Sequence, residues 1–139
     1  MIRIAVTGAS GFIGRHVLAA LSAANVDVVA HARGARPELA SAPRLRWVFF
    51  DLARPPADAF DQLGQPDAII HLAWQGLPNF LSPHHAEIEL PAQEAFLRGL
   101  IASGLRRLVV TGTCFEYGMQ SGCLSEDTET RPSNAYGQV

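Results

Sequence analysis

Charge, cysteine and long apolar runs are all scarce in this chain of 139 residues, and each scarcity excludes a class of protein. Charged residues make up 17% of the chain and the formal net charge is −2, which argues against a nucleic acid as partner. No apolar run approaches the roughly 20 residues that a membrane-spanning helix needs. The first residues form an apolar strand without a basic region or cleavage site, so we expect no signal peptide. We therefore expect a cytoplasmic protein with no membrane partner.

Cysteine occurs only twice, as Cys114 and Cys123. A chain of this length buries roughly two-thirds of its unfolded surface and needs no disulfide scaffold. We interpret both thiols as reduced, with a Cys114–Cys123 disulfide as the alternative. The length corresponds to one domain, residues 1–139.

The most informative stretch is a glycine-rich turn between an apolar run and an amphipathic pattern. Apolar residues 2–6 are followed by Gly8, Gly11 and Gly14, spaced G-x-x-G-x-x-G. In a dinucleotide site the first glycine permits a tight turn, the second leaves room for the pyrophosphate, and the third allows close packing of the helix on the sheet. The pyrophosphate then binds the free N–H groups of the helix. An ordinary strand–helix turn can hold three glycines too, but the flanking patterns favour a dinucleotide site.

Strand and helix patterns alternate along the rest of the chain. Short apolar runs predict buried strands at 2–6, 26–30, 46–50, 67–72 and 107–111. Residues 33–44 and 74–85 are predicted loops. This alternation predicts an α/β fold, a Rossmann-type doubly wound parallel sheet with five strands in the order 3-2-1-4-5.

Three helices are predicted between these strands. The first has a core stripe of Ile13, Val17, Leu18 and Leu21 and ends at Asn25, and a short one runs from Pro55-Pro56 toward Leu63. The third ends at Gly104, and Pro91 must lie in its first turn or kink it. Its core stripe is Phe96, Leu97, Leu100 and Ile101.

Polar and small residues stand at the carboxyl ends of several predicted strands. They are Asp51 and Leu52 after the third strand, His71, Leu72 and Ala73 at the fourth, and Thr111 and Thr113 at the fifth. The carboxyl ends of parallel strands share one edge of a sheet, where a ligand can contact all of them. Plainer interpretations are a cap or turn for Asp51, a structural role for His71, and turn chemistry for the threonines.

Taken together, these residues resemble the extended short-chain dehydrogenase/reductase family of nucleotide-sugar epimerases, dehydratases and reductases. Residues 7–14, TGASGFIG, are similar to its T-G-x-x-G-(F/Y)-(I/L)-G fingerprint. Residues 51–52 match its adenine-contact pair, and residues 71–73 match its H-L-A strand end. The resemblance implies cofactor-binding roles for Gly8, Ser10, Gly11, Phe12, Ile13, Gly14, Asp51, Leu52, Leu72, Ala73 and Thr111.

Two hydroxyls fall at the catalytic positions of that family. Thr113, four residues before Tyr117-Gly118, matches its catalytic Ser or Thr, and Tyr136 matches the tyrosine of Y-x-x-x-K. The resemblance implies proton transfer by Tyr136 and positioning of the substrate oxygen by Thr113, while hydride moves between a nicotinamide and a sugar carbon. The plainer interpretation of Tyr136 is a surface tyrosine near a helix start. Residues 112–118 also resemble a subgroup that reduces 4-keto-6-deoxy sugar nucleotides.

The sequence departs from the family pattern at its end. The motif lysine belongs directly after Val139, and the later strands and the substrate-binding lobe are absent. We therefore expect the N-terminal piece of a longer enzyme, truncated before the C-terminal strands and inactive alone. Tyr136 is expected in a frayed terminal turn, and the fifth strand as an exposed edge prone to self-association, with a homodimer as an open alternative.

A second departure lies near the start of the third helix. Glu89 stands where the family often has asparagine, so no role follows for it from the resemblance. His84, His85 and Glu87 have the composition of a metal cluster, but they lie where a loop becomes a helix, and we expect no metal site.

The end of the second strand predicts the cofactor. A site that prefers NAD usually has an acidic residue about 20 residues beyond the glycines, to hold the ribose 2′-hydroxyl. Residues 29–34 read VAHARG, with no carboxylate before Glu38. Arg33 can pair with a 2′-phosphate, and Arg36 adds to the same positive charge. We predict NADP(H) over NAD(H), with Arg33 as a solvated loop charge as the alternative.

Two classes of function remain after this reading. One is an NAD(P)-dependent enzyme acting on a nucleotide-activated sugar, and the other is a non-catalytic NAD(P)-binding sensor or regulatory module of the same fold. Thr113 and Tyr136 favour the enzyme, because a binding module needs neither hydroxyl. The sugar, the nucleotide and the choice among reduction, epimerisation and dehydration stay open.

Overall fold

Five parallel strands form one sheet in the computed structural model, which describes residues 1–34 and 40–139. The strands are β1 (Arg3–Thr7), β2 (Asp27–Ala32), β3 (Leu45–Phe49), β4 (Ala68–His71) and β5 (Leu108–Val110). Their order is β3-β2-β1-β4-β5, and every neighbouring pair is parallel. The predicted order is confirmed, and the strand bounds differ from the predicted ones by one or two residues.

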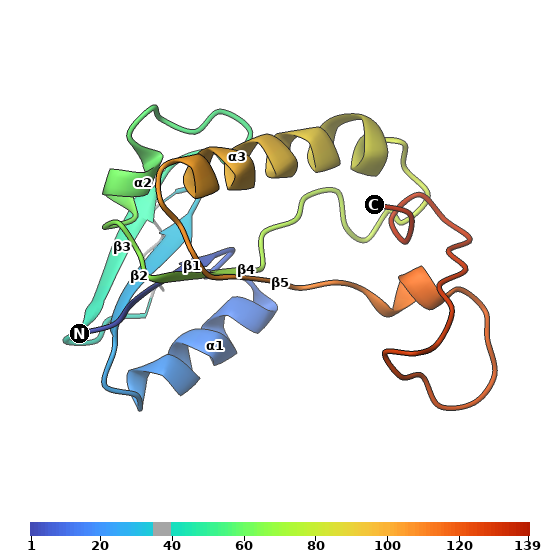
Figure 1. The fold of residues 1–139 in the computed structure, drawn as a ribbon, viewed down its shortest axis with the longest axis horizontal. Coiled ribbons are helices and arrows are strands. Elements are labelled where there is room, and N and C mark those ends of the chain that lie inside the picture. The colour runs from blue at the N-terminus through green and yellow to red at the C-terminus, as the bar shows by residue number, and fades with distance from the viewer. Residues whose placement is uncertain (35–39) are drawn as a thin grey trace.

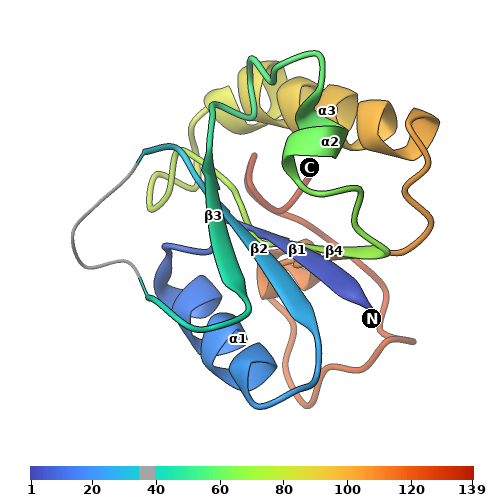
Figure 2. The same cartoon turned by 90° about the vertical axis from the view of Figure 1, so that its left-hand side faces the viewer.

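Helices cover both faces of this sheet. The helix α1 (Phe12–Ser22) packs on one face, and α2 (Ala59–Gln62) and α3 (Leu90–Ala102) pack on the other (Figures 1 and 2). Successive strand residues point to opposite faces. Val6 therefore packs with Leu18 of α1, whereas its neighbour Ala5 shares a core with Phe96 of α3. The apolar residues of one strand thus supply two cores at once, one on each face of the sheet.

The first helix ends three residues earlier than predicted. It stops at Ser22, and the N–H of Ala24 donates to the carbonyl oxygen of Leu21 at 3.0 Å in a tighter turn. Asn25 does not cap the helix, because its side-chain oxygen accepts a hydrogen bond from Arg44. The Asn25 side chain therefore makes a tertiary contact with Arg44 and does not cap the helix, although the sequence predicted Asn25 as the helix end.

Two residues assigned to the core stripes lie outside the core. Ile13 of α1 and Ile101 of α3 are each 53% exposed. Both line the same cavity at the carboxyl side of the sheet, described below. Each faces open space rather than the packed interior, so this part of the predicted core was wrong.

The third helix follows a wide helical turn. A π-helical segment, η1 (His85–Glu89), precedes α3, and Pro91 lies in the first turn of α3 as predicted. Proline lacks an N–H, and its ring crowds the carbonyl four residues earlier, so a wider turn there relieves the clash. Gly104 ends the helix with φ +115°, as predicted. No helix in the described ranges is long and apolar enough to cross a membrane.

The chain after β5 turns back toward the loop that follows β4. A short 3-10 helix, η2 (Cys114–Tyr117), comes first, and the N–H of Arg131 then donates to the carbonyl oxygen of Glu116 at 2.9 Å. The N–H of Tyr136 donates to the carbonyl oxygen of Phe80 at 3.1 Å. Figure 1 shows the C-terminus beside this loop. The expectation of a frayed terminal turn around Tyr136 was wrong, because long-range contacts hold it.

Candidate functional site

Two of the three glycines in the turn after β1 are required by packing within the protein. Gly8 has φ +66°, and a Cβ there would lie 2.8 Å from the backbone nitrogen of Ala73. At Gly14 a Cβ would lie 2.6 Å from the carbonyl carbon of Ala9, so α1 could not approach the turn. Gly11 differs, because its only close neighbour would be the carbonyl oxygen of Gly8 at 3.1 Å. The open side of Gly11 faces a cleft.

The N-terminus of α1 is suited to an anion. Gly11 is its N-cap, no side chain caps its free N–H groups, and its first turn has no acidic residue. Unpaired N–H groups and the positive end of the helix dipole together attract phosphate. The space beside Gly11 and the free helix end therefore fit a pyrophosphate.

A cleft of about 210 Å³, here called the glycine cleft, opens beside Gly11 at the carboxyl edge of the sheet. Seven predicted cofactor residues line it, contributed by the glycine turn and by the ends of β2, β3 and β4: Gly8, Ser10, Gly11, Arg33, Leu52, Leu72 and Ala73. No acidic residue is among the described residues that line it.

The other predicted cofactor residues lie elsewhere. Phe12 is 73% exposed with the Arg15 guanidinium 4.9 Å from its ring centroid, and Gly14 is packed against the turn. Asp51 is exposed and accepts a hydrogen bond from the N–H of Ala53 at 3.0 Å, which is the turn role that was its alternative. Ile13 and Thr111 line the neighbouring cavity.

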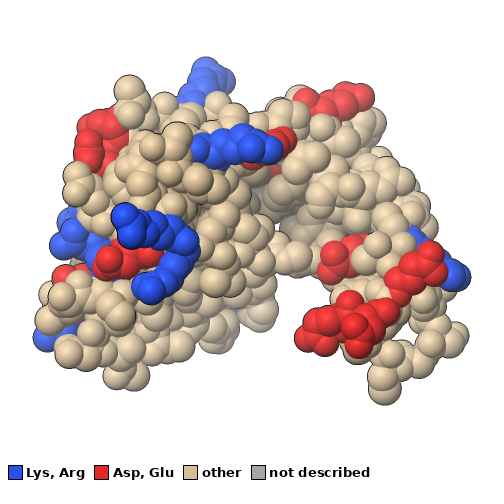
Figure 3. Space-filling view, viewed as in Figure 1, with Lys and Arg blue, Asp and Glu red and all other residues tan. Residues whose placement is uncertain are grey.

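A larger cavity of about 640 Å³, here called the tyrosine cavity, adjoins the glycine cleft. Thr113 and Tyr136 both line it, together with residues of α3 and the end of β5. Figure 3 shows this side of the molecule hollowed between the sheet with its helices and the segment after β5. The two hydroxyl residues, 23 positions apart in the sequence, are thus brought to one space.

The glycine cleft and the tyrosine cavity share one wall. Leu72, Ala73, Trp74 and Gln93 line both spaces. A molecule longer than one cleft could extend along the sheet edge past Ala73 from one space to the other.

Thr113 has a structural role beside its place in the cavity, because its Oγ1 accepts a hydrogen bond from the N–H of Phe115 at 3.3 Å and caps η2.

Two buried histidines lie under this edge. His71 is 2% exposed, its Nδ1 lies 2.8 Å from Thr7 Oγ1, and burial lowers its pKa to about 4. His31 is 1% exposed and its Nε2 donates to the carbonyl oxygen of Phe50 at 2.9 Å. Burial also lowers the pKa of His31, against a raising effect of the Phe50 hydrogen bond and of Asp51. Both rings are neutral at pH 7.

Residues 4–139 match the NAD dependent epimerase/dehydratase family. The chain belongs to this family. The dTDP-6-deoxy-L-talose 4-dehydrogenase (NAD(+)) of Aggregatibacter actinomycetemcomitans is 30% identical over 139 residues, which cover 98% of this chain and 50% of that protein. The fold and the glycine turn agree with this membership.

Solved structures of similar proteins carry the same fold. MoeE5 in complex with UDP-glucose and NAD is 30% identical with a TM-score of 0.77, and the match covers 98% of this chain and 44% of that one. A UDP-galactose 4-epimerase is 24% identical with a TM-score of 0.80, covering 99% and 47%, and shares the fold. The chain spans about half the length of these relatives.

The sequence assigned no role to three residues of this epimerase/dehydratase family member, Gln75, Glu89 and Gln93, which are linked by hydrogen bonds to the predicted Arg33. Arg33 Nη1 donates to Gln75 Oε1 at 2.9 Å across the glycine cleft, and the N–H of Gln75 donates to Glu89 Oε1 at 2.9 Å. Gln93 Nε2 donates to the same carboxylate oxygen at 2.6 Å. The four-residue spacing of Glu89 and Gln93 was the only signal in the sequence. Arg36 and Glu38 lie outside the described residues.

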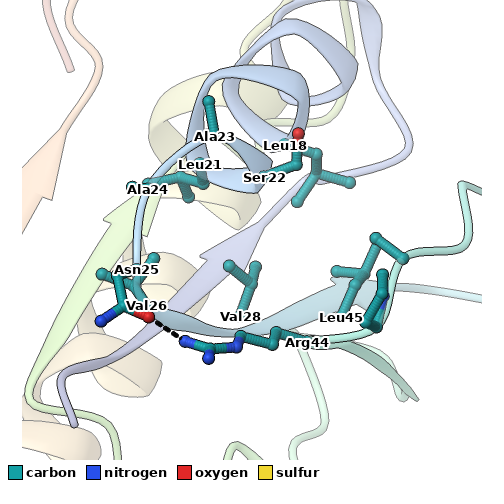
Figure 4. A pocket seen from close by; sticks show the side chains of 12 residues that line it. Leu18, Leu21, Ser22, Ala23, Ala24, Asn25, Val26, Val28, Arg44 and Leu45 are labelled. Carbon is teal, nitrogen blue, oxygen red and sulfur yellow. Dashed lines mark hydrogen bonds between the residues drawn. The ribbon is translucent and has the colours of Figure 1, made fainter.

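A third cavity, of about 360 Å³, lies at the opposite edge of the sheet (Figure 4). The end of α1 and the amino ends of β2 and β3 form it, with Leu18, Val28 and Leu45 inside and the Arg44–Asn25 hydrogen bond at its rim. None of the predicted site residues lines it. Cys114 and Cys123 are both exposed.

Proposed function

We propose that this chain is the dinucleotide-binding part of an NAD(P)-dependent enzyme that acts on a nucleotide-activated sugar. The observation that carries the proposal is the pair Thr113 and Tyr136 on the wall of a cavity that adjoins the glycine cleft. Residues of the glycine turn and of the strand ends would hold the dinucleotide, and among them Arg33 and Leu52 line only the glycine cleft. The dinucleotide would then extend past Ala73 and the shared wall, with one half in the glycine cleft and the other in the tyrosine cavity.

The chemistry follows from the two hydroxyls. A bound nicotinamide supplies the hydride donor or acceptor. Tyr136 would move a proton on or off the sugar oxygen, and Thr113 would hold that oxygen by a hydrogen bond. A free tyrosine has a pKa near 10, so its phenolate needs a nearby positive charge, and this sequence contains no lysine to supply one. Since the relatives are about twice as long, we propose that activity resides in the whole gene product.

Reduction of a 4-keto-6-deoxy sugar nucleotide is the specific reaction that we propose. The relative from Aggregatibacter actinomycetemcomitans is named a dTDP-6-deoxy-L-talose 4-dehydrogenase, and reduction at carbon 4 is the reverse of such a reaction. Residues 112–118 supported the same subgroup from the sequence. Epimerisation and dehydration are the alternatives within the family, and a panel of nucleotide sugars distinguishes them by product.

A preference for NADP(H) is the corresponding proposal for the cofactor. Arg33 lines the glycine cleft, and no described residue there is acidic, so a 2′-phosphate would meet a positive charge. The relatives named above are described with NAD, so both cofactors have to be compared.

The decisive experiment replaces Tyr136 with phenylalanine in the whole gene product. We expect a fall in kcat of about 10²–10⁴-fold, because a positioned proton donor typically contributes that much. The Kd of the cofactor should change little. Tyr117→Phe is the matched control, since Tyr117 lies outside both spaces of the site.

Unchanged turnover in the Tyr136→Phe protein would overturn the assignment of this residue. Tight dinucleotide binding without turnover of any sugar in the panel would favour the alternative, a binding module. The capping role of Thr113 is the observation in favour of that alternative.

A further inference from the structure

We propose that His85 is a positioning residue that holds Trp74 and Tyr136 in the tyrosine cavity. The proposal rests on the proposed function, because it gives His85 a part in placing the Tyr136 hydroxyl. Neither the glycine cleft nor the tyrosine cavity is lined by His85. It acts through the residues that it contacts.

His85 is completely buried, and both of its ring nitrogens are hydrogen-bonded within the protein. Trp74 Nε1 donates to His85 Nδ1 at 3.1 Å, and His85 Nε2 lies 2.8 Å from the carbonyl oxygen of Asn79. An indole N–H only donates and a carbonyl only accepts, so the ring is neutral with its proton on Nε2. Both partners belong to the loop between β4 and η1.

Gly76 lets the same loop close tightly around the His85 ring. It has φ +92°, and a Cβ there would lie 2.9 Å from His84 Cδ2 and 3.0 Å from His85 Cε1. The loop thus contacts His85 at Trp74, Gly76 and Asn79. His84, the residue before His85, also lies beside Gly76, and its Nε2 lies 3.7 Å from Glu89 Oε2. With both nitrogens engaged, His85 has no lone pair left for a metal.

The loop around His85 is also the support of Tyr136. The Tyr136 ring centroid lies 5.1 Å from that of His85, 5.7 Å from Phe80 and 6.1 Å from Trp74. The carbonyl oxygen of Phe80 accepts from the N–H of Tyr136 at 3.1 Å. Residues 131–139 form no helix or strand of their own, so the place of the tyrosine ring depends on these contacts with the loop and on Phe115 of η2, whose ring centroid lies 6.2 Å away.

A displacement of the Tyr136 hydroxyl would lower kcat more than it would weaken binding of the cofactor. Misplacing a reacting group by about 1 Å can cost on the order of 100-fold in rate. The glycine cleft would hold most of the dinucleotide, and His85 does not line it but is hydrogen-bonded to Trp74 in its wall. Loss of His85 should therefore lower kcat while the cofactor still binds.

The test compares His85→Leu with His85→Gln in the whole gene product. We expect His85→Leu to lower kcat about tenfold or more, with the Kd of the cofactor within about twofold of the parent. His85→Gln should restore most of the activity, because its amide can accept from Trp74 and donate to Asn79. The matched control is His16→Leu, which removes an exposed histidine on α1. Unchanged kcat in His85→Leu, or equal losses in both His85 variants, would overturn the proposal.

Two further measurements keep the test decisive if His85→Leu does not fold or the parent shows no turnover. Trp74→Phe keeps an aromatic ring, although a smaller one, and removes the N–H donor to His85. It should lower kcat in the same way, and unchanged kcat would count against the proposal. The emission of Trp74, recorded in residues 1–139 with Trp47→Phe as background, should respond to His85→Gln less than to His85→Ala and not to His16→Leu. No response to His85→Ala would refute the contact itself, whereas absent turnover with the expected emission would refute only the proposed function.

Discussion

Acidification from pH 7 to pH 5 is expected to destabilise this fold by about 2 kcal/mol through His71 alone. Burial lowers the pKa of His71 from 6.5 to about 4 in the folded chain. Between these values the unfolded chain binds a proton that the folded chain does not bind. Stability therefore rises with pH across this window and is lost as the pH falls below 6.5. At about 1.4 kcal/mol per pH unit, the free energy of unfolding that is lost through His71 is about 2 kcal/mol at pH 5 and reaches about 3 kcal/mol below pH 4.

Urea unfolding at pH 7 and pH 5 tests this reasoning, with His71→Asn as the variant. The asparagine oxygen can take the place of Nδ1 opposite Thr7 Oγ1 but does not titrate. The parent should lose about 2 kcal/mol more than the variant between the two pH values. The pKa of His31 is also lowered by burial, and this residue and the carboxylates contribute to both proteins alike.

Equal losses in parent and variant would refute the account. A direct NMR titration of the His71 ring in the parent gives the same answer without a variant. A midpoint near 4 is expected, and a midpoint near the value of a free histidine would contradict it.

The glycine turn and Arg33 give three further predictions. Gly11→Val should abolish dinucleotide binding, measured by calorimetry, because the side chain would occupy the space that the pyrophosphate needs. Tm should change little, since a Cβ there would meet only the Gly8 oxygen at 3.1 Å. Gly14→Ala should instead lower stability by several kcal/mol, because its Cβ would lie 2.6 Å from a backbone carbon; a stable Gly14→Ala protein would contradict this. Arg33→Ala should weaken NADP(H) about tenfold and NAD(H) less than twofold at one ionic strength, and an equal loss for both would exclude Arg33 as the selector.

Much of the fold followed from local patterns. The alternation of short apolar runs with amphipathic segments predicted the strand order, because parallel strands joined by helices have few ways to pack. The conformations of Gly8 and Gly104 were predicted for a similar reason, since each glycine ends or begins an element in its own neighbourhood. The role of Asp51 could not be decided from the sequence, because a turn and a ligand contact require the same residue type.

The sequence by itself determined the family, the sheet and the edge where its predicted site residues gather. Glycine spacing and hydrophobic period are local properties, and they survive without knowledge of distant partners. Only the tertiary structure decided which side chains share a wall: Tyr136 reaches Phe80 and His85 across more than fifty residues of sequence. It also decided that Ile13 faces a cavity and that Arg33 meets Gln75. These outcomes depend on packing between distant segments, for which residue type and spacing carry no signal.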